Sequence, residues 1–377
     1  MKYLLVYATA LIALSCTARA QIQSAQSGSF TDTSTWVGGV VPTTGTFNVN
    51  DTHIVTADSG TVWNSAGSGF NVFGTLNINT GASLTSGTGR LNDGSPTTTG
   101  IVNINGGSLS VNRIFASSAT GNITVNLFSG SLSVTSAATT LSGGETINVS
   151  GGTMILAGSL AGTTKFNMTG GSSVINGLSR WGSINTWTGG TITTNNSTSM
   201  NSSGMAAFID DFNSSSTNIW NLSSLSAKQT FSYTNANSAY TVTSGTIEFD
   251  VYSATANDND LLSLTNGSLS KIMFSSNAHF NINDVNLSGT AASYIGSTYQ
   301  LLNFSATSNT YTGVLATLDP AVWNIGGQDY NVGFTNNLAT NGSITVASLT
   351  AVPESSTFGL VTLALVGIAG LRRRRAV

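Results

Sequence analysis

The chain has 377 residues, and only 7% of them are charged, against about 25% in an ordinary soluble domain. Twelve basic and fifteen acidic residues leave a net charge of −3, which excludes the basic face that binding to nucleic acid requires. One cysteine excludes a disulfide framework, and two histidines are too few for a histidine-rich metal cage, so we expect no cofactor.

Residues 1–20 have the pattern of a secretory signal peptide. A positive start precedes a charge-free apolar stretch, and Ala18 and Ala20 supply the small-x-small pattern that a signal peptidase accepts. We expect a signal helix here and cleavage before Gln21. Two alternatives stay open: a buried N-terminal helix, and a lipoprotein signal in which Cys16 carries the lipid.

Residues 21–60 are expected to cap the first unit of the fold. Trp36 and Pro42 precede an alternating apolar stretch over 47–55, and large side chains there suit covering an open sheet edge. From residue 21 to 350 the chain has six basic and fourteen acidic residues, a net charge of −8. A mildly acidic body without cysteine suits a location outside the cytoplasm.

A short block recurs through the middle of the chain: apolar, Asn, apolar, any residue, Gly or a small residue, Gly, Ser or Thr, and often a further apolar residue. Its copies contain Asn77, Asn103, Asn126, Asn148 and Asn167, and align Gly81, Gly107, Gly130, Gly152, Gly171 and Gly190. Alternating apolar residues predict strands with one buried face, and the glycines predict sharp turns between strands. Related copies follow at 240–247, 262–269 and 285–290.

A period near 20 residues without a helical pattern predicts one coil of a β-solenoid, since each coil must stack on its neighbours to bury its apolar side. We expect an all-β fold, a right-handed parallel β-helix over 61–290, with the asparagines in one outward row. The Ser- and Asn-rich stretch 195–235 breaks the pattern and is expected to form a long external loop or an inserted hairpin. The repeats resemble autotransporter-like passenger repeats, which implies a stalk, an adhesin or a matrix component.

Candidate catalytic residues are few. Glu248 and Asp250 share one face of a strand, where we expect them to point to solvent. Asp258 and Asp260 lie in an oxygen-rich turn that could supply calcium ligands, although a turn that tolerates left-handed backbone explains the same residues. The two histidines, at 53 and 279, are expected to be isolated. We therefore expect no catalytic residue and no metal site beyond these weak calcium candidates.

The C-terminal part changes character. Longer aromatic segments over 291–350 predict a small antiparallel cap. Residues 351–377 then combine a short motif, fourteen residues without charge over 358–371, and a basic end. The apolar segment predicts a hydrophobic helix, and the positive-inside rule places the basic end in the cytoplasm. The named residues of this tail are Val352, Pro353 and Glu354, then Arg372, Arg373, Arg374 and Arg375.

The order of these three parts resembles the PEP-CTERM sorting signal of Gram-negative bacteria that make exopolysaccharide. In that family a Pro-Glu-Pro motif precedes a hydrophobic helix and an arginine cluster, whereas here Ser355 follows Pro353 and Glu354. The resemblance covers 26 residues. It implies recognition by an exosortase, a membrane cysteine protease-transpeptidase. An ordinary tail anchor is the alternative.

These expectations describe an exported protein of the cell envelope, anchored through its C-terminus or released into the matrix. We expect a structural or adhesive role among exopolysaccharide, with the exosortase-type enzyme, the membrane and the polysaccharide as partners, and no nucleic acid. Two alternatives stay open: a secreted polysaccharide lyase or hydrolase on the same β-helix, and an adhesin that binds protein.

Overall fold

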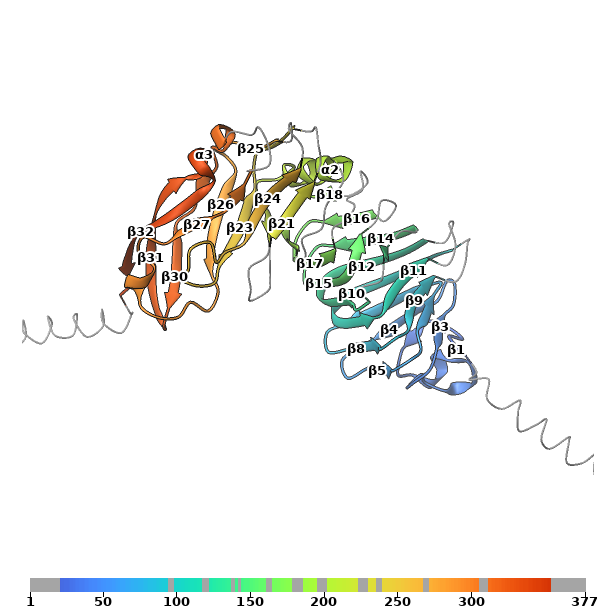
Figure 1. Ribbon diagram of the computed structural model, residues 1–377. Coiled ribbons are helices and arrows are strands. Elements are labelled where there is room, and N and C mark those ends of the chain that lie inside the picture. The colour runs from blue at the N-terminus through green and yellow to red at the C-terminus, as the bar shows by residue number, and fades with distance from the viewer. Residues whose placement is uncertain are drawn as a thin grey trace, which may run out of the picture.

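The computed structural model describes residues 21–93, 98–116, 122–136, 140–141, 144–160, 165–177, 186–194, 202–222, 230–234, 239–266, 271–304 and 311–353. It is mainly β and contains the predicted parallel β-solenoid, with about seven turns. The solenoid spans residues 22–248 instead of the expected 61–290, because residues 21–60 already supply strands to the parallel ladders. Figure 1 shows the coils following one another from β1 (Ile22–Gln23), and the C-terminal part continuing at an angle to β32 (Ser343–Ala351) at the other end of the molecule.

Successive coils add strands to several parallel ladders, which differ in length. The first ladder has five strands: β1, β3 (Phe47–Val49), β6 (Phe70–Val72), β9 (Arg90–Asp93) and β11 (Arg113–Ala116). The second contains β2 (Gly28–Ser29), β4 (Ile54–Ala57), β7 (Thr75–Asn79), the first half of β10 (Thr99–Val111), the first half of β12 (Asn122–Val134), β14 (Gly144–Val149), β16 (Lys165–Met168) and β18 (Thr186–Trp187).

The third ladder is the longest and runs past the end of the solenoid. It contains β5 (Val62–Ser65), β8 (Ser83–Ser86), the second halves of β10 and β12, β15 (Thr153–Leu160), β17 (Ser172–Gly177), β19 (Gly190–Thr194), β20 (Asn218–Asn221), β23 (Thr246–Val251), β26 (His279–Asp284) and β29 (Thr317–Leu318). The short β13 (Thr140–Leu141) pairs with the end of β15.

Alternating side chains explain why these segments form strands. In β7 the side chains of Leu76 and Ile78 are fully buried, while their neighbours face outward. Residues in register stack on them in the following coils, as Val102 and Ile104 do in β10. Because each fully buried aliphatic side chain stabilises by about 1.5–3 kcal/mol, the interior rows hold the coils together.

A column of glycines turns the chain between the second and third ladders. Gly152 has φ +71°, and a Cβ there would lie 2.5 Å from the carbonyl oxygen of Gly130 in the preceding coil. The predicted glycine turns are thus confirmed, with one shift: in the coil of β10 the left-handed residue is Gly106, not Gly107. The ladder is irregular there, since Asn79 of β7 pairs with both Asn105 and Gly106, and the pairing of β10 with β12 skips Phe128.

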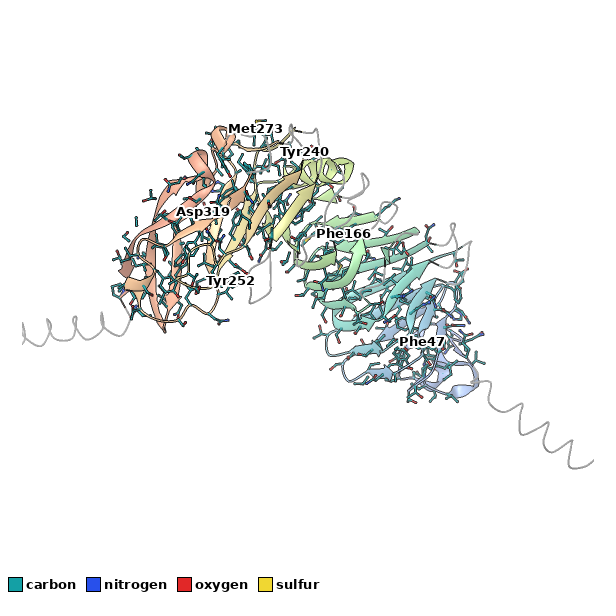
Figure 2. The ribbon with its side chains drawn as sticks, in the orientation of Figure 1. Phe47, Phe166, Tyr240, Tyr252, Met273 and Asp319 are labelled. Carbon is teal, nitrogen blue, oxygen red and sulfur yellow. The ribbon has the colours of Figure 1, made fainter. Side chains whose placement is uncertain are left out.

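Aromatic side chains pack together in the first coils. Phe47, labelled in Figure 2, stacks on Phe70 with ring centroids 4.8 Å apart and meets Trp63 edge-on. Trp36 is 2% exposed and donates from Nε1 to the Phe30 carbonyl at 2.7 Å. Two short 3-10 helices, Thr33–Thr35 and Val37–Gly39, flank Trp36.

The expectation of an external loop or hairpin over 195–235 is wrong. The described part of this stretch contains the helix α2 (Ser202–Phe212), followed by β20 and β21 (Thr230–Thr234). Phe208 and Phe212 are fully buried, and their rings lie 4.9 Å from Trp220 and 5.2 Å from Trp187. Their i, i+4 spacing gives α2 one apolar face, so packing of that face decides the helix.

The C-terminal part keeps parallel pairing on one side and changes to antiparallel on the other. Two further parallel ladders are β21–β24–β28 (with β24 at Leu261–Asn266 and β28 at Leu302–Asn303) and β22–β25 (Ala239–Val242 and Lys271–Phe274). The expected antiparallel sheet is present, in the order β27 (Thr298–Gln300), β32, β31 (Gln328–Asn337) and β30 (Ala321–Ile325). Short helices lie at Ala291–Ser293, Tyr311–Gly313 and α3 (Leu338–Asn341).

Candidate functional site

The predicted asparagine row is confirmed on the outer side of the second ladder. We call it the amide row, and its members are Asn77, Asn103, Asn126, Asn148 and Asn167. Each later member donates from Nδ2 to Oδ1 of the one before, at 2.9, 2.8, 2.7 and 2.8 Å. Thr56 accepts from Asn77 at one end, and Thr186 donates to Asn167 at the other. The amides therefore satisfy one another without any charge.

A second outward row carries hydroxyl groups beside the amide row. We call it the hydroxyl row, and its members are Ser83, Ser108, Ser131, Thr153, Ser172 and Thr191, in register across six strands of the third ladder. Ser131 and Thr153 are exposed, and the others are half-buried. Within the described residues the structure gives these hydroxyls no hydrogen-bond partner, so they remain available to a ligand.

A second amide row crosses the first ladder and was not predicted. Asn71 donates to Asn48 at 2.7 Å, and Asn92 donates to Asn71 at 3.1 Å. Gln21 joins this row by donating to Asn48 at 2.6 Å. The signal in the sequence was the repeated Phe-Asn-Val of residues 47–49 and 70–72, which places each Asn between two buried side chains.

The acidic cluster is formed by Asp250 and the three carboxylates that act on it, those of Asp260, Glu248 and Asp284. The expectation that Asp250 points to solvent is wrong, because the chain after β23 turns back over it. Asp260 donates its N–H to the Asp250 carbonyl at 2.9 Å, and one of its carboxylate oxygens lies 3.3 Å from the Asp250 N–H. Asp250 is 6% exposed and Asp260 is fully buried. Glu248 stays half-buried and accepts from Asn281 at 3.4 Å.

Burial governs the ionisation of this cluster. The pKa of Asp250 is raised from 3.8 to about 7, mainly by burial and also by the nearby charge of Asp260, while a hydrogen bond from Asn283 opposes the change. Burial also raises the pKa of Glu248, against the hydrogen bond from Asn281. A carboxyl with a pKa near neutrality is a feature of general acids, but Asp250 lies under the 252–260 return rather than in an open cleft.

The two calcium candidates are held by protein donors. Asp258 accepts from the Ser253 hydroxyl, and Asp260 accepts from the Tyr252 hydroxyl at 2.9 Å. Asn257 has φ +61°, the left-handed conformation that the sequence allowed for this turn. No group of three or more His, Cys, Asp and Glu side chains that could hold a metal ion is found in the parts of the chain that the structure describes.

Both histidines have partners, so the expectation that they are isolated is wrong. His53 Nδ1 lies 2.8 Å from the hydroxyl of Ser24, which is buried. His279 Nδ1 lies 2.6 Å from Asp319 Oδ1, and strand pairing places Thr317 of β29 directly beside His279. The His279–Asp319 pair could not be predicted from the sequence, because its members are 40 residues apart.

Most residues of the predicted signal and sorting segments lie outside the described residues: Ala18, Ala20, Glu354 and the four arginines at 372–375. Val352 is described, and its N–H donates to the Asp329 carbonyl at 2.8 Å. Pro353 is the last described residue. Among helices that the structure does describe, none is both long and apolar enough to cross a bilayer.

Comparison of the chain with family models, with curated proteins and with solved structures finds no match. The fold and the rows of side chains on its surface therefore carry the functional argument by themselves.

Proposed function

We propose that this protein is an exported structural or adhesive component of the cell envelope or extracellular matrix, associated with exopolysaccharide. The hydroxyl row is the observation that carries this proposal. It presents hydroxyl groups in register, one from each strand of a ladder whose strands are about 4.8 Å apart. A polysaccharide is a chain of hydroxyl-bearing units, and a row of hydroxyls can exchange hydrogen bonds with it without ionic contacts.

The low charge of the body supports the same proposal. With 7% charged residues, the chain offers few groups for steering a charged partner, so recognition must rest on hydrogen bonds and shape. The amide row supplies rigidity, because its hydrogen bonds fix each coil on its neighbour. A stiff, polar and nearly uncharged surface suits a scaffold among glycans.

The route to this location is part of the proposal. A cleaved signal over 1–20, a hydrophobic helix over 358–371 and the arginines at 372–375 would deliver the chain to an exosortase-type enzyme. The coils would wind in the right-handed sense usual for parallel β-helices. Support for the route comes from the sequence patterns alone.

The proposal is tested by retention on the polysaccharide of the host's own matrix. We expect the wild-type chain to be retained, and a variant carrying Ser108→Val, Ser131→Val and Thr153→Val to lose retention. The matched control carries Thr124→Val and Thr146→Val, which lie in a row interrupted by Ile101 and Lys165. Absence of retention for the wild type contradicts the proposal, as does equal loss for both variants.

The two alternative functions give other outcomes. Turnover of a polysaccharide, lost in Glu248→Ala and Asp250→Ala, would identify an enzyme. Cell clumping that survives glycan digestion would identify an adhesin for protein. The buried position of Asp250 favours neither a lyase nor a hydrolase, since a catalytic acid must reach its substrate.

A further inference from the structure

A groove of about 520 Å³ lies between β29 and β31, where the last parallel strand meets the antiparallel sheet. Its walls include Thr317, Leu318, Asp319, Val332, Phe334 and Asn336. We propose that this groove binds a neutral hexose unit of a polysaccharide. The inference deepens the proposed function and rests on it, because it names a discrete sugar site apart from the hydroxyl row.

Asp319 is held as a hydrogen-bond acceptor on one wall. Its N–H donates to the Phe280 carbonyl at 2.9 Å, which ties the backbone to β26. Carboxylate Oδ1 lies 2.6 Å from His279 Nδ1, and 31% of the side chain is exposed. Since the imidazole occupies one oxygen, the second oxygen can accept a hydrogen bond from a sugar hydroxyl. Figure 2 labels Asp319 in the C-terminal part of the molecule.

Asn336 is held as a donor on the other wall. Its Oδ1 accepts from the N–H of Leu338 at 2.9 Å. Because a backbone N–H needs an oxygen partner, this contact fixes the orientation of the amide. The Nδ2 group of Asn336 has no partner among the described residues, and the side chain is exposed. It can therefore donate to a ligand oxygen.

Phe334 supplies a fixed apolar surface between these polar groups. Its half-buried ring meets Trp323 edge-on, with centroids 5.6 Å apart. Trp323 is fully buried and donates from Nε1 to the Ile282 carbonyl at 2.9 Å, so the support does not move. An apolar surface with a few fixed donors and acceptors is the usual composition of a small-molecule site, and a sugar ring has one C–H face and a rim of hydroxyls.

The charge of Asp319 distinguishes neutral sugars from acidic ones. Asp319 is the only titratable residue among the described residues that line the groove, and its carboxylate pairs with His279. A uronate would bring a second carboxylate close to Asp319, and like charges at such distances repel. The groove therefore fits a neutral hexose better than an acidic one.

Calorimetric titration of the full chain tests this inference, with dextran, cello- and manno-oligosaccharides as neutral probes and oligogalacturonate as the acidic probe. We expect binding of at least one neutral probe, and no binding of oligogalacturonate at the same site. Asp319→Ala and Asn336→Ala should each weaken binding about tenfold, since each removes a hydrogen bond to the sugar. Thr335→Ala is the matched control, because Thr335 is exposed on the opposite face of β31.

Circular dichroism of each variant checks that it folds, and Asp319→Leu, which is close in size and has no hydrogen-bond acceptor, repeats the test if Asp319→Ala does not fold. Equal affinities for Asp319→Ala, Asn336→Ala and Thr335→Ala overturn the groove assignment, as does failure of every neutral probe or preference for oligogalacturonate. If the groove variants bind the neutral oligosaccharides as tightly as the wild type does while the matrix polysaccharide is retained, the groove assignment fails and the proposed function stands. If neutral oligosaccharides bind the groove while the matrix polysaccharide is not retained, the proposed function fails.

Discussion

Substitution of the central member of the amide row measures how much that row contributes to stability. Asn126 donates to Asn103 at 2.8 Å and accepts from Asn148 at 2.7 Å, so Asn126→Ala removes two hydrogen bonds. At about 1 kcal/mol for each, the free energy of unfolding should fall by about 2 kcal/mol. Asn77→Ala should cost less, since the bond to Thr56 at its free end is long, at 3.4 Å.

Urea unfolding, followed by circular dichroism, gives these free energies, and amide hydrogen exchange in β12 shows whether the loss is local. Asn122→Ala is the matched control, because Asn122 is exposed on the same strand and outside the row. The variant Asn126→Ala/Asn148→Ala should lose about 1 kcal/mol less than the sum of the single variants, since they share one bond. Strict additivity, or equal losses in Asn122→Ala and Asn126→Ala, would refute the stabilising role of the row.

Three further predictions concern other parts of the fold. Gly152→Ala should destabilise the protein by about 3 kcal/mol or more, since it combines left-handed backbone strain with a clash against the Gly130 carbonyl. Gly60→Ala, at a position with φ +86° and open space, should cost about 1–2 kcal/mol. Equal changes in melting temperature for the two variants would contradict the clash. Phe212→Ala should lower the free energy of unfolding by about 3–5 kcal/mol, because the Phe212 side chain is fully buried. The variant should also make α2 sensitive to proteolysis before the coils unfold. A digestion pattern like that of the wild type would show that α2 does not depend on this packing. Folding raises the pKa of Asp250 to about 7, so its contribution to stability is complete below about pH 4 and is lost as the pH rises through 7. Asp250→Asn should therefore flatten the dependence of the unfolding free energy on pH, measured by chemical unfolding at pH 4 to 8. The same dependence on pH in the variant and the wild type would contradict this prediction.

The solenoid was predictable because its signal is repeated. Alternation around Asn103 or Asn126 is weak in one copy, but in-register copies require the same face to be buried in every coil. The same reasoning predicted the amide row. It failed to find the row through Asn48 and Asn71, because those copies are only three residues long.

The parts that could not be predicted depend on contacts between distant residues. Alternation correctly placed Asp250 on the outer side of β23, but it carries no information about the return of residues 252–260 over that side. The His279–Asp319 pair joins two strands 40 residues apart, and the groove beside it needs a third strand, β31. The i, i+4 spacing of Phe208 and Phe212 is a local signal for helix α2, but the sequence analysis searched this stretch for strands and did not use it.

Because similar coils stack on one another, the length of this molecule can change by one whole coil at a time. Each coil pairs with the one before and the one after, so removal of 22 residues from Asn126 to Ile147 would bring Asn148 next to Asn103 and Phe166 one coil nearer to the N-terminal aromatic group. Gene duplication or loss of such a segment could lengthen or shorten the rod without creating a new interface. The distance between the two ends of the molecule could thus evolve separately from the surfaces at those ends.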